Sequence, residues 1–301
     1  MKRTALVFLL STLLLSAFSQ QDTAATPEPA DSSLAAPVKS RSYFSAALGF
    51  LSNSVYNGRK DTASTPYLSP VIGYYHKSGL FADVSMSYLA KAGSSRIDLF
   101  NVEAGYDFSL GNFDGELSAN KSFYNSSSSN VKAEITGSAF FTGGYDFVYI
   151  RPTFEAGINF GTHTDYLLAL GLEHTFYLAK DKLQITPGLL GNGSTQNYYN
   201  AYYKNRKVSR KRKTGNVVYD VTTLVEDAAK FKMLDYECSL PVSYTINKLT
   251  ISLTPVYAVP VNAAQVTTTL VPEGGGVTKT KTAQETISNS FYCSFGLSYK
   301  F

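Results

Sequence analysis

The strongest pattern in the chain is an alternation of apolar and polar residues with a period of two. It is clearest in residues 234–245 and 287–301, where large apolar side chains occupy nearly every second position and mostly small or polar residues lie between them. Successive side chains of a β-strand point to opposite faces, whereas a helix repeats every 3.6 residues. These segments therefore predict strands with one apolar and one polar face.

The same alternation recurs along the chain in segments of about ten residues that end at turn residues. The predicted strands cover residues 42–51, 67–77, 80–89, 97–109, 114–124, 131–146, 148–160, 166–178, 183–191, 231–245, 249–261 and 287–301. They number twelve, and an even number brings both ends of a barrel to the same side of a membrane.

A soluble β-sandwich also alternates, so the links between strands are needed to choose between the two folds. Long links alternate with short ones along the chain, and the longest cover residues 192–230 and 262–286, whereas 77–79 and 247–248 are tight turns. Outer-membrane barrels have long external loops and short periplasmic turns. The expected fold is an all-β, antiparallel up-and-down transmembrane barrel of about twelve strands over residues 42–301.

Composition supports the membrane interpretation. Charged residues make up 17% of the chain, there are 22 Tyr and 19 Phe, and mean hydropathy is −0.09. Soluble domains contain about 25% charged residues. Prolines inside the proposed strands oppose it, because each removes a backbone donor. We expect bulges or strand ends at Pro70, Pro152, Pro187, Pro241, Pro255 and Pro260.

The first 41 residues differ from the rest. Lys2 and Arg3 precede an apolar run that ends in Ser16-Ala17-Phe18-Ser19, the pattern of a cleaved signal peptide over residues 1–19. Residues 20–41 are rich in Pro, Ala, Ser and Thr and predict a flexible periplasmic leader. The expected location is the outer membrane of a bacterial cell.

The chain resembles bacterial outer-membrane barrels through this signal peptide and through a last strand of alternating aromatic residues that ends in Tyr299-Lys300-Phe301. That resemblance implies insertion by the barrel assembly machinery through Phe301. Asn53-Ser54-Val55-Tyr56-Asn57-Gly58-Arg59, Pro66 and Gly73–Ala82 are also similar to the opening hairpins of the TorF-like putative porin family. The resemblance carries no catalytic residue.

Catalytic and metal sites are not indicated. None of His76, His163 and His174 has a serine and an orienting group placed for nucleophilic catalysis. No cluster has metal-ligand spacing, and no cofactor is expected; Asp235 and Glu237 are interpreted as solvated carboxylates. Cys238 and Cys293 are expected to be free thiols, because a strand lies between theirs.

Parity along the strands gives the polar face an excess of acids. Residues expected to line the lumen are Asp83, Glu103, Glu116, Glu134, Arg151, Glu155, Glu173, Asp235 and Glu237, with Asp107, Asp146, Lys132 and Lys300 on the same face. Carboxylates on a low-dielectric wall attract cations. Pairs such as Arg151 with Glu155, or Lys132 with Glu134, could instead bridge strands and plug the lumen.

The longest loop contains a run of basic residues. They are Lys204, Arg206, Lys207, Arg210, Lys211, Arg212 and Lys213. In an intracellular protein such a run suggests nucleic acid, but none is expected here. On an outer-membrane barrel it suggests contact with lipopolysaccharide phosphates, or a merely solvated loop. Outer-membrane lipid is the expected partner.

The sequence therefore predicts a pore for passive diffusion of small solutes with a weak preference for cations. The alternative is a non-conducting barrel whose long loops bind lipid or a surface partner. A lipid-modifying enzyme is the third possibility, and we expect that the protein is not an enzyme.

Overall fold

The computed structural model describes residues 41–60, 64–207, 211–214 and 217–301. The expected signal peptide, and all of the expected leader except Arg41, lie outside the described residues.

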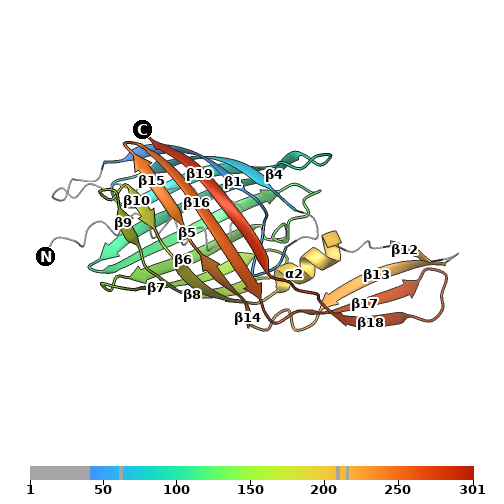
Figure 1. The fold of residues 1–301 in the computed structure, drawn as a ribbon. Coiled ribbons are helices and arrows are strands. Elements are labelled where there is room, and N and C mark those ends of the chain that lie inside the picture. The colour runs from blue at the N-terminus through green and yellow to red at the C-terminus, as the bar shows by residue number, and fades with distance from the viewer. Residues whose placement is uncertain (1–40, 61–63, 208–210, 215–216) are drawn as a thin grey trace.

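Fifteen strand segments form the barrel wall (Figure 1). They are β1 (Tyr43–Leu51), β2 (Tyr67–Tyr75), β3 (Leu80–Leu89), β4 (Arg96–Leu110), β5 (Phe113–Tyr124), β6 (Gly137–Tyr145), β7 (Arg151–Phe160), β8 (Asp165–Glu173), β9 (Phe176–Leu178), β10 (Leu183–Ile185), β11 (Gly188–Ser194), β14 (Lys232–Ser239), β15 (Val242–Ile246), β16 (Leu249–Pro260) and β19 (Ser290–Lys300). Three pairs of these segments, β8 with β9, β10 with β11 and β14 with β15, are each one strand with a short break.

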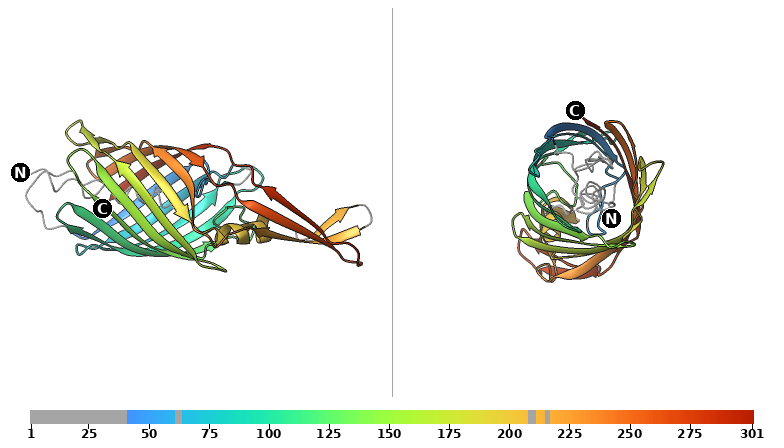
Figure 2. Two further views of the ribbon diagram at one scale, coloured as in Figure 1. Left: turned by 90° about the horizontal axis from the view of Figure 1, so that it is seen from below. Right: turned by 90° about the vertical axis from the view of Figure 1, so that its left-hand side faces the viewer.

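The wall is therefore a twelve-stranded antiparallel barrel, as the sequence predicts. Each strand pairs with its neighbours along the chain, and β1 also pairs with β19, from Ser45 opposite Lys300 to Leu51 opposite Ser294. This last pairing closes the ring, which Figure 2 shows end-on. Closure gives the backbone of every wall strand a partner on both sides, and lipid requires this.

Prolines explain the breaks. Pro187 separates β10 from β11, and Pro241 separates β14 from β15. Without an N–H, each leaves a gap in the ladder, but its carbonyl accepts a bond from the neighbouring strand: His174 N to Pro187 O at 3.2 Å and Thr186 N to Pro241 O at 2.9 Å.

The remaining prolines follow the same rule. Pro255 lies opposite the gap between β14 and β15, and its carbonyl accepts from Leu240 N at 3.1 Å. Pro70 lies where the pairing of β2 with β3 is interrupted, Pro152 is the second residue of β7, and Pro260 ends β16. Irregularity at the prolines is confirmed.

The two faces of the wall differ as the alternation predicts. Outward side chains are large and apolar, with Phe291 68% and Leu170 61% exposed. Inward side chains are mostly Ser, Thr, Asn and acids, and many are buried. A molecule that exposes a continuous apolar band around a closed sheet is a transmembrane β-barrel of the bacterial outer membrane.

The two longest predicted loops contain regular secondary structure. Residues 195–231 contain α2 (Asn197–Tyr202), the π-helical turn η1 (Tyr203–Lys207), β12 (Lys211–Thr214) and β13 (Val217–Val225), and residues 261–289 contain β17 (Gln265–Pro272) and β18 (Lys279–Gln284). Strands from both loops pair in the order β12-β13-β17-β18. This four-stranded sheet, which we call the arm, extends away from the barrel (Figures 1 and 2).

One predicted boundary is wrong. The strand expected over residues 131–146 begins at Gly137, and residues 131–134 form a turn instead. Val131, Ala133 and Ile135 are buried in this external loop because they pack into the mouth of the barrel. Their alternation with Lys132 and Glu134 imitates a strand.

Candidate pore lumen and external mouth

Four acids lie near one another on one side of the lumen. Asp83 of β3 is directly opposite Glu103 of β4, and Glu103 is within electrostatic range of Asp83, Glu116 of β5 and Glu155 of β7. All four come from the parity set that the sequence predicts. Lys132, from the loop between β5 and β6, is a cation within electrostatic range of Glu155. We call Asp83, Glu103, Glu116 and Glu155 the acidic wall.

Two further predicted acids lie closer to the external end. Asp235 and Glu237 are inward residues of β14 and are almost completely buried. Tyr292 of β19 donates a hydrogen bond from Oη to Glu237 Oε1 at 3.1 Å, across the intervening β16. The interpretation of Asp235 and Glu237 as solvated carboxylates is therefore wrong, because neither side chain is open to solvent.

At the periplasmic end, one arginine holds three carboxylates. Arg151 Nη1 lies 3.0 Å from Asp114 Oδ2 and 2.9 Å from Asp146 Oδ1, and Arg151 Nε lies 3.3 Å from Glu173 Oε1. The predicted pair of Arg151 with Glu155 is absent from the ion pairs of the described residues. Arg151 is buried, so its positive charge is held among these carboxylates and is not exposed to the open lumen.

Glu134 is not a residue of the barrel wall. It lies in the loop between β5 and β6, and its Oε2 accepts a hydrogen bond from Asn205 Nδ2 at 2.9 Å. Lys132 of the same loop lies over the ring of Tyr56, with Nζ 5.3 Å from the ring centroid. Because these residues belong to a loop, strand parity could not place them.

The loop between β1 and β2 crosses the external mouth. We call residues 52–60 and 64–66 the mouth loop, and its residues Ser54 to Arg59 are all buried. Asn159 of β7 donates from Nδ2 to Tyr56 Oη at 2.7 Å. In the ring of twelve strands, β7 is six strands from β1 in either direction. The loop therefore spans from one side of the barrel to the other.

The mouth loop fits closely against the wall at Gly58. The residue has φ +69°, and a Cβ built there would lie 2.6 Å from Cβ of Pro260 and 3.0 Å from Cβ of Asp235. A left-handed backbone with no space for a side chain requires glycine.

Arg59 joins the mouth loop to the base of the arm. Nη1 donates to Asn57 O at 2.9 Å, Nη2 donates to Asn262 O at 3.1 Å, and Nε lies 3.6 Å from Glu285 Oε2. Asn262 lies before β17 and Glu285 follows β18. One buried guanidinium therefore contacts both ends of the β17–β18 hairpin.

Tyr199 of α2 completes this contact. Its Oη donates to Glu285 Oε1, and the guanidinium carbon of Arg59 lies 5.6 Å from its ring centroid. Burial, reinforced by the neighbouring Glu285 carboxylate, raises the pKa of Tyr199 well above its usual value, so the phenol keeps its proton and remains a donor. We call Arg59, Glu285 and Tyr199 the latch.

Helix α2 is fixed by a side chain from the wall. Asp165 of β8 accepts from Asn197 N and from Tyr198 N, each at 2.7 Å. It therefore satisfies two backbone donors at the helix start that Gln196, at the N-cap position, leaves unpaired. The buried side chains of Tyr198, Tyr199 and Tyr202 then pack against the other apolar residues at the mouth.

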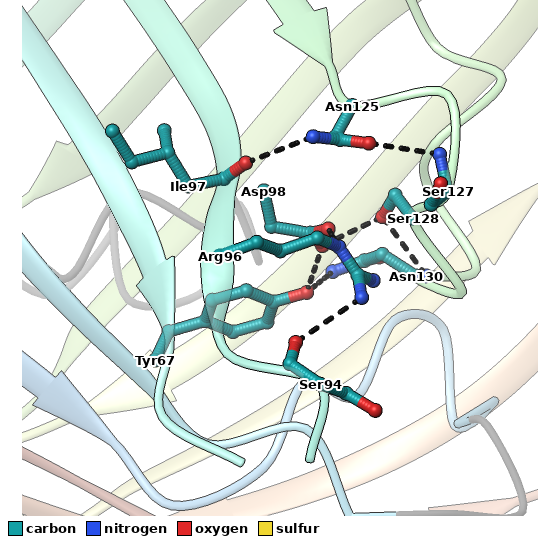
Figure 3. A network of polar contacts seen from close by, with 9 residues as sticks. All are labelled: Tyr67, Ser94, Arg96, Ile97, Asp98, Asn125, Ser127, Ser128 and Asn130. Carbon is teal, nitrogen blue, oxygen red and sulfur yellow. Dashed lines mark hydrogen bonds and ion pairs between the residues drawn. The ribbon is translucent and has the colours of Figure 1, made fainter. Parts of the chain in front are cut away.

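A polar cluster at the external end of the barrel holds two loops against the wall (Figure 3). Asp98 of β4 accepts from Tyr67 Oη at 2.5 Å, from Ser128 Oγ at 2.6 Å and from Arg96 Nε at 2.7 Å. Asn130 donates to Tyr67 Oη at 3.4 Å and to Ser54 Oγ of the mouth loop at 3.1 Å. The cluster joins two strands to two external loops.

The predicted basic run is divided by the fold. Lys204 is exposed in η1, whereas Lys211, Arg212 and Lys213 are exposed on β12 of the arm. Lys211 Nζ pairs with Glu273 Oε1 at 2.6 Å, and this bond raises the pKa of Lys211. The backbones of Arg206 and Lys207 belong to η1, and Arg210 lies outside the described residues.

The histidines do not form a catalytic arrangement. His76 Nδ1 lies 2.8 Å from Ser78 Oγ, but both residues belong to one exposed turn. His174 packs edge-on against Phe176, and His163 lies in the link between β7 and β8. Within the described ranges, no group of three His, Cys, Asp or Glu could hold a metal ion.

Several residues of the site are not predicted from sequence. They are Tyr56 and Arg59 of the mouth loop, Asp98 and Asp114 of the wall, and Glu285 beside the arm. The dipeptide Asn57-Gly58, with both residues at positive φ, is the one local signal of a tight turn there. Contacts between distant loops leave no periodic signal.

No helix among the described residues is long and apolar enough to cross a membrane.

Comparisons with known proteins identify no family. No family model matches, so the TorF-like resemblance is not confirmed, and no curated protein matches. Among solved structures, the chain is similar to the KdgM porin (TM-score 0.45, 9% identity, 85% of this chain and 99% of that one) and to the NanC porin (0.44, 9%, 86% and 100%). It is also similar to LpxR from Salmonella typhimurium (0.44, 9%, 85% and 100%).

Proposed function

We propose that the barrel is a narrow pore for passive diffusion of small solutes that prefers cations, and that the mouth loop restricts its external opening. The acidic wall supports the preference. Asp83, Glu103, Glu116 and Glu155 gather four carboxyl groups on one side of the lumen, and ionised carboxylates on a low-dielectric wall stabilise cations and repel anions. No enzymatic role is proposed.

The latch supports the restriction. The mouth loop reaches β7 through Tyr56 and the arm base through Arg59, so it is fixed at two separated points. Breaking a buried ion pair costs about 3–5 kcal/mol. The loop therefore stays across the mouth at rest, and wild-type conductance should be small for a barrel of twelve strands.

Reversal potentials in planar bilayers test the preference. We expect wild-type protein under a KCl gradient to pass potassium in preference to chloride, and Glu103→Gln with Glu116→Gln to weaken that preference. Asp227→Asn with Glu273→Gln is the matched control, because it removes two exposed carboxylates outside the lumen and should leave selectivity unchanged. Chloride selectivity in the wild type would refute the proposal.

A non-conducting barrel is the second candidate, because the mouth loop spans the full width of the opening. The Arg59→Ala variant separates the two. If neither wild type nor Arg59→Ala conducts after insertion is verified, the pore is refuted and the non-conducting barrel is supported.

A further inference from the structure

The arm has two faces of different chemistry. Its strands pair without register shifts, so residues directly opposite one another share a face. One face, which we call the basic face, carries Arg212 opposite Tyr219, Lys279 opposite Leu270, and Lys281 opposite Thr268. Lys211, Lys213 and Asp220 lie on the other face.

The basic face has cations without acids. In the four described strands it carries Arg212, Lys279 and Lys281, all exposed, and no Asp or Glu. On the opposite face, Lys211 pairs with Glu273, and Asp220 is close by. Only the basic face therefore presents a concentration of positive charge, which favours a ligand with repeated negative groups.

Tyr219 adds a flat apolar surface between these cations. Arg212 lies directly opposite it on β12, and Lys279 Nζ lies 5.9 Å from its ring centroid. An aromatic ring provides a large contact area at a low entropic cost, and its hydroxyl can form a hydrogen bond. A ring beside cations suits a sugar unit that carries a carboxylate.

The length of the arm places the basic face at a distance from the barrel. The arm extends away from the external mouth (Figures 1 and 2). Leu270, opposite Lys279, is five residues beyond Gln265, or roughly 16 Å along an extended strand. A headgroup layer adds only about 5–8 Å on each side of the hydrocarbon core. Dissolved polymer reaches this face more readily than lipid phosphate.

We propose that the basic face of the arm binds an acidic polysaccharide outside the cell, with Arg212, Lys279 and Lys281 contacting its carboxylates and Tyr219 contacting a sugar ring. This inference is independent of the pore, because it requires only that the arm folds as described.

The test measures binding of alginate, a polyuronate, to the full protein in nanodiscs without lipopolysaccharide. We expect saturable binding that weakens as NaCl rises from 0.05 to 0.5 M, because exposed charges are screened. Neutral dextran of equal length should not bind. Lys279→Gln with Lys281→Gln should weaken binding by about fivefold, in line with two exposed ion contacts.

The matched control is Lys211→Gln with Lys213→Gln, which removes the same charge from the opposite face of the same sheet. It should change affinity less than about twofold, because Lys211 is already paired. Tyr219→Phe should keep the affinity and Tyr219→Ala should lower it. Equal losses in both lysine variants, equal binding of dextran, or binding only to purified lipopolysaccharide or an acidic protein would overturn the proposal.

Discussion

Asn159 donates a hydrogen bond of 2.7 Å to Tyr56, although Asn159 lies on β7 and the loop of Tyr56 follows β1, on the opposite side of the barrel. A contact of this kind cannot arise from neighbouring strands. It requires the mouth loop to pass over the lumen. There, Tyr56 also packs edge-on against Tyr198, with 5.0 Å between the ring centroids. The mouth of the barrel is thus bridged by a loop that leaves β1.

The Tyr56 to Asn159 bond should hold the mouth loop in place. Tyr56→Phe removes the hydroxyl and leaves a buried amide without this partner, at a cost of about 1–3 kcal/mol. We expect higher single-channel conductance than in the wild type. Tyr166→Phe is the control, because Tyr166 is an exposed residue at the same end of the wall. Equal conductance in all three proteins would show that the loop does not restrict the mouth.

The latch should have a larger effect. Glu285→Gln removes the charge that faces Arg59 and keeps the side-chain shape, so a buried guanidinium loses its carboxylate. We expect frequent transitions to a higher-conductance level in single-channel recordings. Glu273→Gln removes an exposed carboxylate from the link between β17 and β18 and should leave the traces unchanged. A variant of Glu285 with wild-type traces contradicts a role of the latch in gating.

The wall could be predicted from sequence because lipid on one side and polar lumen on the other impose an alternation with a period of two. Every predicted strand is present, and the only large boundary error is at residues 131–136. That error has a physical reason, since a loop folded into the mouth also buries alternate residues such as Val131 and Ile135. The breaks at Pro187 and Pro241 follow from the missing donors.

The mouth was not predictable in the same way. Parity assigns Asp83, Glu103, Glu116 and Glu155 to the lumen face, and the structure brings them together. It says nothing about Arg59, whose partners Asn262 and Glu285 are more than two hundred positions away in the chain. The arm was missed for a related reason. Each loop folds into a hairpin, β12 with β13 and β17 with β18, but the pairing of β13 with β17 joins two separate loops, so neither loop alone indicates the four-stranded sheet.

Charge should be tolerated on the lumen side of a strand and not on the lipid side. Leu240 points outward with 44% of its surface exposed, whereas Ser239 is buried and points inward. Leu240→Arg should reduce the free energy of unfolding in a bilayer by about 2–4 kcal/mol. Ser239→Arg should mainly alter conductance. Equal losses of stability in refolding titrations would show that the orientation of β14 is wrong.

The two cysteines should titrate as free thiols. Cys238 lies on β14 and Cys293 on β19, with β16 between them, and both are free in the structure. Two strand spacings amount to about 9.5 Å, beyond the limit of about 7 Å between bridged alpha carbons. Titration of unreduced, denatured monomer should find two thiols. A count of zero would contradict the order of the strands.

Arg151 should control both stability and selectivity at the periplasmic end. Arg151→Gln leaves Asp114, Asp146 and Glu173 close together without their shared cation. Removing one partner of buried ion pairs costs about 3–5 kcal/mol, so the midpoint of urea unfolding should fall.

In protein that still inserts, the added negative charge should increase potassium selectivity. This increase should shrink as salt rises, because the Debye length falls from about 10 Å at 0.1 M to about 3 Å at 1 M. Lys248→Gln is the control, because Lys248 is an exposed cation in the turn between β15 and β16, outside the lumen. A variant of Arg151 that loses stability without any change in reversal potential would show that these carboxylates hold the wall together but do not face the path of the ions.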